Sequence, residues 1–396
     1  MTSSKDNSAK RVLFIGHAAS RSGAPILLLQ FLAWLKTNSN LSFDAKVVLD
    51  GPLLDDMRAV APTEVIDTVP SLSARVARKV VGAERWSRRA DRSFQRAVRH
   101  GAYDLAYVNT IVPAREIGLI SQLGIPVVCH VHELDFAMMQ MVGEAGIQRL
   151  IPQVAHFIAA SGAVGDYLRR RWKIDESKIS VIHEFTLEPK SGSGKSADRN
   201  RTRAELGVRD DEILIGSCGT LDWRKGADLF LQVSRLIAAE VRSPSMTFVW
   251  VGANLAHPDT KRFLHDVRAA GLEGAVRVVA ATSEPGRYYE AMDIFALTSR
   301  EDPFPLVMLE AAAAGLPIVC FAGSGGGPEF VEADAGLVAP YLDVDAFAQH
   351  VLELAADANA RRALGAAGHR KVKERYVVTV QAPKLLGVIS SVLRNE

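Results

Sequence analysis

Cysteine is scarce in this chain of 396 residues. Only Cys129, Cys218 and Cys320 occur, far apart in the sequence, and each lies in or beside an apolar, strand-like run. This placement is typical of buried structural thiols and argues against a redox pair or a thiolate metal site. We therefore expect a cytoplasmic protein.

Long hydrophobic runs and an excess of charge of one sign are absent as well. No uninterrupted apolar run is long enough to span a bilayer, and the opening residues MTSSKDNSAKR lack the apolar core of a secretion signal. The 47 Lys and Arg residues nearly balance the 45 Asp and Glu residues, for a formal net charge of +2. This balance argues against a dedicated nucleic-acid-binding protein.

Short β-branched runs alternate with longer helical patterns along the whole chain. Near-continuous apolar strands separated by helices are typical of parallel sheets covered on both faces. Two such series predict an α/β protein with two Rossmann-like, doubly wound domains. The expected strands are 11–16, 45–50, 103–109, 125–131, 156–160 and 179–183 in the first series, and 213–219, 246–252, 276–280, 293–299 and 317–321 in the second.

A polar stretch rich in Gly and Ser, 187–202, separates the two series and is predicted to be a flexible linker. It contains GSGKS, but Pro189 stands where a phosphate-binding loop needs glycine, and no strand precedes it. The predicted domains are therefore 1–186 and 203–372, followed by a last helical segment over 373–396.

In open α/β sheets, ligands bind beyond the carboxyl ends of the strands, so the loops there are the candidate sites. The first loop, GHAASRSGAP, places Gly23 at a helix entrance, where backbone N–H groups can approach an anion. The dinucleotide-binding pattern GxGxxG is absent, and an ordinary strand–helix turn remains the alternative.

A second loop, CGTLDWRKGADLF, follows a strand that ends at Gly219. It carries Arg224 and Lys225, and Gly226 then opens a helix. Two cations beside a helix N-terminus fit a diphosphate, because the helix dipole and the charges both attract it. A solvated surface pair would use the same residues.

The third loop lies in SREDPFPLVMLEAAAAGLPIVCF (299–321). Asp302 precedes a helix and Glu310 lies eight residues further on, so both carboxylates can converge on one ligand. Carboxylates accept pairs of hydrogen bonds from the vicinal hydroxyls of sugars. In the alternative interpretation, Glu301 and Asp302 only favour the helix N-terminus. Glu310 is harder to explain in that way, because the residues around it are apolar.

The fourth loop, CHVHELDF (129–136), holds His130, His132, Glu133 and Asp135, which suggests a metal site. No further histidine follows at helical spacing, and acid–base or hydrogen-bonding work needs only one of these side chains. We expect no metal here.

With these four loops in order, the chain resembles the retaining GT-B glycosyltransferases of family GT4, which include bacterial enzymes that build mannosides and lipopolysaccharide. The similarity covers essentially the whole chain and is strongest over 213–332. Its most specific part is the acid pair followed by EAAAAGLPIV, which is similar to the family's E-x7-E signature.

The resemblance implies two domains that face each other across a cleft, with the donor held mainly by the second and the acceptor by the first. It also implies that the last helix, within 373–396, crosses back to the first domain. It implies that Glu310 binds the nucleotide ribose, that Arg224 and Lys225 neutralise the diphosphate, and that His132 lies near the transferred sugar. The residues implied in catalysis are Asp302, Glu301, His132, Lys225 and Arg224, and those implied in donor binding are Gly23, Gly219, Arg224, Lys225, Asp302, Phe304, Leu306 and Glu310.

The chain departs from the family pattern at three positions. Asp302 is one methylene shorter than the usual Glu, and Glu301 beside it is the other candidate for the sugar contact. Pro305 stands where Gly is frequent, which leaves the N–H groups of Phe304 and Leu306 as donors. Thr220 replaces a frequent arginine and leaves more phosphate charge to the basic pair.

The implied reaction moves a hexose-type sugar from a UDP- or GDP-sugar to a cell-envelope glycan or lipid-linked acceptor, with retention and without a metal or other cofactor. The Asp-x-Asp at 343–345 is expected to cap a helix. Two alternatives remain: another GT-B enzyme such as a sugar-nucleotide epimerase, and a non-catalytic nucleotide-sugar-binding protein.

The segment 73–100 is strongly basic, with Arg88, Arg89 and Arg92 near its centre. A basic amphipathic helix suits adsorption to anionic lipid, which would place the protein on the cytoplasmic face of the inner membrane. A solvated helix whose apolar side packs on the sheet is the alternative.

Overall fold

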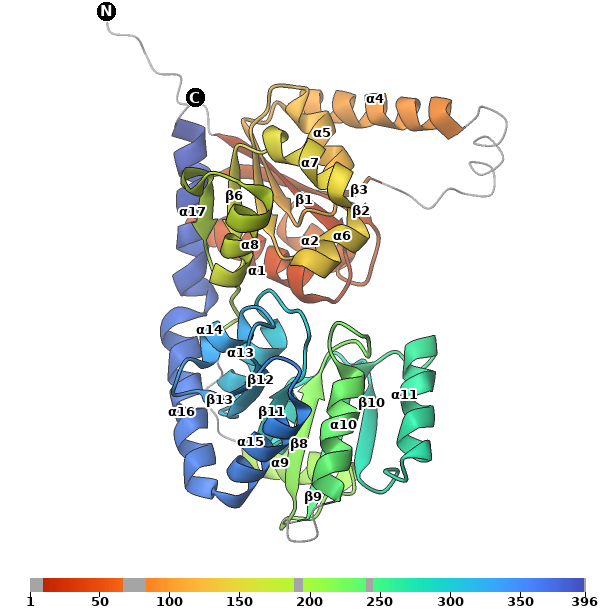
Figure 1. Cartoon of the computed structure of the whole chain (residues 1–396). Coiled ribbons are helices and arrows are strands. Elements are labelled where there is room, and N and C mark those ends of the chain that lie inside the picture. Colours follow the sequence, from red (N-terminus) through yellow and green to blue (C-terminus); the bar gives the residue numbers. More distant parts are fainter. Residues whose placement is uncertain (1–9, 67–82, 189–194, 240–244, 395–396) are drawn as a thin grey trace, which may run out of the picture. The chain divides into compact units, whose positions relative to one another are not determined.

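The computed structural model describes residues 10–66, 83–188, 195–239 and 245–394. The chain forms two compact units (Figure 1). One comprises Met1–His183 together with Val378–Glu396, and the other comprises Glu184–Val377. Each contains a parallel sheet with helices on both faces, so the prediction of two Rossmann-like domains is confirmed.

The first unit contains a seven-stranded sheet in the order β3-β2-β1-β4-β5-β6-β7, with every neighbouring pair parallel. The strand order reverses between β1 and β4, which is the usual ligand position in such sheets. The central strands β4 and β5 are buried along their whole length. The strands are β1 (Arg11–Ala18), β2 (Ser42–Leu49), β3 (Thr63–Val65), β4 (Leu105–Asn109), β5 (Val127–Val131), β6 (His156–Ala159) and β7 (Ile179–Val181).

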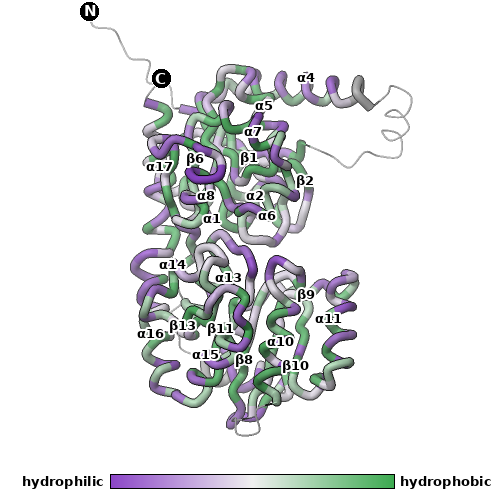
Figure 2. Tube along the Cα trace, viewed as in Figure 1, coloured by the Kyte–Doolittle hydropathy of each residue, from purple (hydrophilic) through white to green (hydrophobic). Residues whose placement is uncertain are grey.

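Helices cover both faces of this sheet, and their apolar sides form the core with the strands (Figure 2). The last helix, α17 (Val378–Arg394), packs on α1 and lies next to β4. The other helices are α1 (Gly23–Asn38), α2 (Leu54–Val60), α4 (Ala83–Gly101), α5 (Ala114–Ser121), α6 (Asp135–Met141), α7 (Glu144–Leu150) and α8 (Gly162–Trp172), with short 3-10 turns at Ile151–Gln153 and Glu176–Lys178.

The second unit contains a six-stranded parallel sheet in the order β10-β9-β8-β11-β12-β13. Its strands are β8 (Ile213–Cys218), β9 (Met246–Ala253), β10 (Val276–Ala280), β11 (Ile294–Leu297), β12 (Ile318–Phe321) and β13 (Gly336–Ala339). Its helices are α9 (Lys195–Glu205), α10 (Ala227–Ala238), α11 (Pro258–Ala269), α12 (Gly286–Ala291), α13 (Leu306–Ala313), α14 (Gly327–Val331), α15 (Val344–Ala356) and α16 (Ala358–Arg375).

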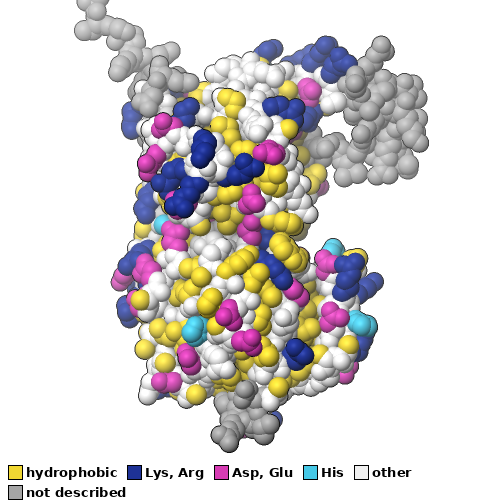
Figure 3. All heavy atoms as spheres, in the orientation of Figure 1, with side chains coloured by type: hydrophobic (Ala, Val, Ile, Leu, Met, Phe, Trp, Pro, Cys, Tyr) yellow, Lys and Arg dark blue, Asp and Glu magenta, His cyan; other side chains and the backbone are white. Residues whose placement is uncertain are grey.

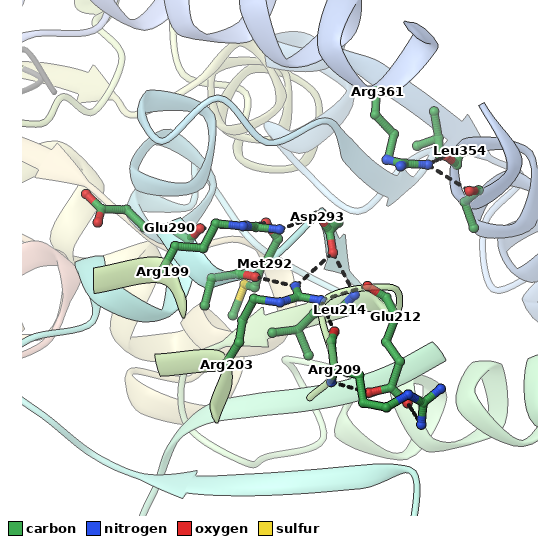
Figure 4. Close-up of polar contacts among 12 residues, drawn as sticks. Arg199, Arg203, Arg209, Glu212, Leu214, Glu290, Met292, Asp293, Leu354 and Arg361 are labelled. Atoms are coloured by element: carbon green, nitrogen blue, oxygen red, sulfur yellow. Dashed lines mark hydrogen bonds and ion pairs between the residues drawn. The ribbon is translucent and has the colours of Figure 1, made fainter. Parts of the chain in front are cut away.

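Helix α9 corrects the linker expected over 187–202, because residues 195–202 form most of it. Arg203 is 2% exposed and donates to the carboxylate of Asp293 at 3.1 Å and to the carbonyl oxygens of Arg209 and Glu212 at 2.8 and 2.7 Å. Arg199 binds the same carboxylate at 2.7 Å (Figure 4). The helix is therefore part of the second unit.

None of the helices in the described parts of the chain combines the length and the hydropathy needed to cross a bilayer.

Candidate active site

The basic pair predicted after β8 lies against the acidic signature. Lys225 Nζ is 2.6 Å from Asp302 Oδ2, and an Nη atom of Arg224 is 3.8 Å from the other carboxylate oxygen. The Ser299 hydroxyl also donates to Asp302 Oδ2, at 3.1 Å. The structure thus brings together residues that lie on two separate loops of the sequence.

Backbone contacts hold these two loops side by side. The N–H of Arg300 donates to the Arg224 carbonyl at 2.8 Å, and Arg224 Nη1 donates to the Glu301 carbonyl at 2.9 Å. Gly226 has φ of +70°, and a side chain there would collide with the carbonyl oxygen of Thr298. Glycine is therefore required where α10 begins, and its fit sets the position of Lys225.

Asp302 is buried, and burial alone would raise its pKa. The nearby cations Lys225 and Arg224 outweigh that effect and hold the pKa of Asp302 below its ordinary value. The carboxylate is therefore ionised at neutral pH and is the counter-ion of Lys225. In this arrangement Asp302 fixes the lysine as well as offering an acceptor for hydroxyl groups.

The start of α13 is rigidly packed. Phe304 is 1% exposed, and its ring centroid lies 5.2 Å from that of Tyr376. Pro305 is the N-cap, and no acidic residue occupies the first turn of the helix. The first N–H groups of a helix, here those of Leu306 and Val307, have no acceptor within the helix. A helix N-terminus thus begins three residues after Asp302.

Glu310 lies on α13 beside Tyr289, whose hydroxyl donates to Glu310 Oε2 at 2.8 Å. Burial raises the pKa of Glu310, although the Tyr289 hydrogen bond partly opposes this. Burial also raises the pKa of Cys218, at the end of β8, to about 11, with Glu310 raising it further and Lys225 lowering it. Glu310 and Lys225 therefore both act on one thiol at the carboxyl end of β8.

Gly219 directly follows that thiol. Its φ of +137° is a conformation that favours glycine. The side chain of Lys225 packs beside it, 3.6 Å from the position that a β-carbon would take. The Gly219 carbonyl accepts the indole N–H of Trp250 at 2.8 Å. The site in the second unit is thus formed by the ends of β8 and β11 and by α13.

Tyr289 was missed in the sequence. Its ring is 2% exposed, and burial raises its pKa well above the ordinary value, so the hydroxyl remains a donor to Glu310. The only signal was the aromatic pair in GRYYEA, which also fits a purely apolar helix.

We expect Glu310→Gln to stabilise the protein without ligand at neutral pH. Burial raises the pKa of Glu310 above its ordinary value of 4.5. Ionising this carboxyl group therefore lowers the free energy of unfolding as pH rises through the folded-state pKa, whereas below pH 4.5 the group is protonated in both states and this loss is absent. Glutamine keeps an oxygen for the Tyr289 hydroxyl, so Tm should rise by about 2–4 °C at neutral pH, or about 1 kcal/mol. Calorimetry from about pH 4 to pH 8 should show the gain only at the upper end, and an equal gain at every pH would contradict the explanation.

In the first unit, Asn109 connects His132 to Ala24, the residue after Gly23. Asn109, the last residue of β4, donates its amide N–H to the carbonyl of Ala24 at 2.8 Å, and its amide oxygen lies 3.0 Å from His132 Nε2. Because that oxygen can only accept, the contact requires a proton on His132 Nε2. Gly23 is the exposed first residue of α1. Asn109 was missed in the sequence, where its only signal was a polar residue at the end of an apolar strand.

The remaining residues of CHVHELDF have structural contacts. His130 is buried, its Nδ1 lies 2.6 Å from the Tyr107 hydroxyl, and burial holds its pKa well below the ordinary value. Glu133 accepts from the Thr110 hydroxyl and from the backbone N–H of His132 at 3.0 Å. Within the described ranges, no three His, Cys, Asp or Glu side chains are grouped to hold a metal ion.

The basic residues Arg88, Arg89 and Arg92 are exposed on α4, whereas Phe94 and Val98 are buried. Figure 3 shows Lys and Arg side chains gathered along this helix. Part of the predicted basic segment, 73–82, lies outside the described residues.

Two family models match the chain. Residues 198–371 match "Glycosyl transferases group 1", and residues 58–185 match "Glycosyltransferase Family 4". Together they cover most of both units, including the basic pair and the acidic signature. The chain belongs to this family of glycosyltransferases, and the resemblance predicted from its motifs is confirmed.

Several curated relatives are glycosyltransferases. The chain is 29% and 30% identical to D-inositol 3-phosphate glycosyltransferases of Kribbella flavida and Stackebrandtia nassauensis, over 43% and 65% of this chain and 42% and 58% of the relatives. It is 29% identical to the GDP-mannose-dependent monoacylated alpha-(1-6)-phosphatidylinositol monomannoside mannosyltransferase of Corynebacterium glutamicum, over 66% of this chain and 68% of that protein. The matches thus span about half the length of the first two relatives.

Among solved structures, the chain is similar to the Anabaena protein HepE in complex with UDP-glucose, with a TM-score of 0.77 and 20% identity over 96% of this chain and 99% of HepE. At this low identity the structural similarity shows the fold alone, and the fold is that of the GT-B glycosyltransferases.

Proposed function

We propose that the chain is a retaining glycosyltransferase that moves a hexose-type sugar from a UDP- or GDP-sugar to a cell-envelope glycan or lipid-linked acceptor. The observation that carries the proposal is the pairing of Arg224 and Lys225 with Asp302 beside the end of β8, in a chain of this family. The names of the relatives support both donor bases, since HepE was solved with UDP-glucose and one relative depends on GDP-mannose.

Charge explains how the second unit would promote transfer. Breaking the bond between the sugar and the diphosphate increases negative charge on the leaving group. Lys225 and Arg224 are already in place, so they stabilise that charge mainly in the transition state, where stabilisation accelerates the reaction. These cations supply the positive charge for which other transferases use a metal, so we propose a metal-independent reaction.

The carboxylates would orient the donor. Glu310 offers acceptors for the two ribose hydroxyls, and its Tyr289 hydrogen bond fixes the side chain. Asp302, or Glu301 beside it, would accept from hydroxyls of the transferred sugar. In the first unit, the His132 ring held by Asn109 is proposed to contact the sugar, and the Gly23 turn to contact phosphate.

No residue stands out in the sequence as a nucleophile, so we propose attack from the same face as the departing diphosphate. A phosphate oxygen of the leaving group would accept the proton of the acceptor hydroxyl. The bond from the anomeric carbon to the diphosphate oxygen breaks, and a bond to the acceptor oxygen forms.

Calorimetric titration of UDP- and GDP-sugars, followed by hydrolysis and transfer assays on the tightest binder, tests the proposal. We expect binding of one nucleotide class, slow hydrolysis, and transfer that retains the anomeric configuration and survives a metal chelator. Conversion of the sugar without an acceptor would indicate an epimerase instead, and binding without turnover would indicate a non-catalytic protein. Failure of every nucleotide sugar to bind would contradict the proposal.

We also propose that α4 adsorbs to the anionic cytoplasmic face of the inner membrane. Replacing Arg88, Arg89 and Arg92 with Glu should weaken binding to anionic vesicles about a hundredfold or more, because each surface cation contributes about 1 kcal/mol. Reversal of Lys261, Arg262 and Arg268, which are exposed on α11, is a control with the same charge change. Equal binding by the two triple variants in a sedimentation assay would contradict a specific role for α4.

A further inference from the structure

A groove lies on the surface of the first unit between two neighbouring helices. Helices α5 and α7 pack side by side (Figure 1), and a cavity of about 450 Å³ is open between them. This volume is within the range of small-molecule sites. The groove is lined by α5 and the loop before it, by the end of α6, and by α7 with the 3-10 turn that follows. The lining residues used below are Val112, Arg115, Gly118, Leu119, Met141 and Arg149.

Glycines within both helices keep the groove open. Gly118 lies in the middle of α5 and Gly146 lies in α7, and both line the groove. Glycine in a helix is less stable than alanine, so its presence there needs a reason. A β-carbon on Gly118 would lie 3.1 Å from the side-chain oxygen of Gln153, another lining residue. A larger side chain at position 118 would therefore narrow the groove.

Much of the groove surface is apolar. Met141 is 58% exposed, although methionine is among the residues most often buried. Leu119 is only partly buried. A concave apolar surface rimmed by polar side chains is typical of a binding site, whereas a single exposed apolar residue is not.

The groove leads to the residues proposed to contact the transferred sugar. Val112 precedes α5 and Gln122 follows it, so the groove runs the length of that helix. Val112 is three residues from Asn109, so their α-carbons are at most about 11 Å apart. The Asn109 amide oxygen in turn lies 3.0 Å from His132 Nε2. A ligand in the groove would therefore have one end near the His132 loop of the same unit.

Cations border the apolar surface. Arg149 is exposed on α7, and no carboxylate of the described residues pairs with it. Arg115 pairs with Asp91 of α4. Gln95 of α4 donates to the Leu119 carbonyl at 3.1 Å, so the groove directly adjoins this strongly basic helix. An apolar groove with cations at its edge fits a hydrocarbon chain that ends in an anionic group.

We infer that the groove holds the hydrocarbon chain of a lipid-linked acceptor and leaves Arg149 available to its phosphate group. The inference rests on the proposed function and narrows its acceptor to the lipid-linked class. Each buried methylene adds to the affinity for the chain, and each nearby cation adds to the attraction for the phosphate. A protein partner fits less well, because a stable interface covers about 800 Å² on each side, whereas α5 has eight residues and is about 12 Å long.

Methyl NMR of the full chain labelled with 13C-methyl-methionine tests the groove directly. The chain has eight methionines, and Met141→Leu assigns the relevant resonance. The probes, each below its micellar concentration, are n-octyl phosphate, inorganic phosphate without a chain, and uncharged n-octyl glucoside. We expect octyl phosphate to shift the Met141 resonance saturably without shifting that of buried Met57.

The affinities of the three probes identify the chemistry of the groove. Octyl phosphate should bind at least about tenfold tighter than inorganic phosphate and about fivefold tighter than octyl glucoside. No shift of the Met141 resonance with octyl phosphate would overturn the inference. Equal affinity for octyl phosphate and either of the other probes would overturn it as well.

Substitutions test the groove without depending on one variant. Gly118→Leu should weaken octyl phosphate binding about tenfold or more, because the side chain occupies space that the alkyl chain needs. Met141→Glu, which places an acid in the groove, should have a similar effect. Leu49→Glu makes the same charge change at a residue that is 49% exposed in the same unit and does not line the groove. Equal affinities of the two Glu variants for octyl phosphate would overturn the inference.

Nucleotide binding separates the groove from the proposed function. Met141→Glu should bind the preferred UDP- or GDP-sugar as the wild type does, because the donor is proposed to bind mainly the second unit. A wild type that binds this nucleotide sugar but not octyl phosphate overturns the groove alone. A wild type that binds no nucleotide sugar overturns the proposed function, even if Met141 responds to octyl phosphate.

Discussion

Lys225→Ala should lower the rate of sugar transfer at saturating donor about 10²–10³-fold, the usual effect of removing one group that stabilises developing negative charge. Lys225 Nζ is held 2.6 Å from Asp302, and the lysine is 15% exposed, so its charge acts with little screening by water. Arg224 remains in the variant but lies further from the carboxylate, at 3.8 Å. Single-turnover kinetics measures the effect on the chemical step.

Two further variants make this prediction specific. Lys225→Arg keeps the positive charge and should recover part of the rate, although the guanidinium differs in shape. Lys261→Ala removes an exposed lysine of α11 and should leave the rate unchanged. A Lys225→Ala enzyme that folds and transfers sugar within about twofold of the wild-type rate would contradict the electrostatic account.

Arg203→Ala should lower the free energy of unfolding by about 3–5 kcal/mol, the usual cost of breaking a buried ion pair. The substitution removes one cation from Asp293 and leaves the carbonyl oxygens of Ala291, Arg209 and Glu212 without this donor. Arg199 still binds Asp293, so the carboxylate keeps one ionic partner. Urea denaturation measures the loss.

Arg201 on the same helix is the matched control for Arg203. Its side chain is 62% exposed and pairs along the helix surface with Asp198 at 2.9 Å and Glu205 at 3.9 Å. Arg201→Ala should therefore change stability by less than about 0.5 kcal/mol. Similar losses in the two variants would show that α9 contributes through helix propensity and not through the buried contact.

The main architecture could be predicted because its signal is local. Each long strand is a continuous apolar run, and both Rossmann-like units follow from alternating strands and helices. Strands β3 and β13 were missed because their apolar signal is weak: β3 contains Thr63 and Glu64, and β13 begins with Gly336. Helix α9 was interpreted as a linker because its composition is polar, and its stabilising partner Asp293 lies 90 residues away from Arg203.

The candidate site could be predicted only in part. The motifs identified Lys225 in the loop after one strand, and Asp302 with Glu310 around the start of a later helix. They did not show that Lys225 and Asp302, 77 residues apart, pair with each other. Tyr289 and Asn109 were missed because a tyrosine in a helix and an asparagine after a strand are common, and only packing shows what they contact.

The central claim is that Lys225 and Arg224 bind the diphosphate of a sugar nucleotide. Titrating the preferred nucleoside diphosphate and its parent nucleoside against wild-type and Lys225→Ala protein tests it most directly. The account predicts that the variant loses at least about tenfold in affinity for the diphosphate and none for the nucleoside. Equal affinities of the two proteins for the diphosphate, or equal losses for both ligands, would contradict it.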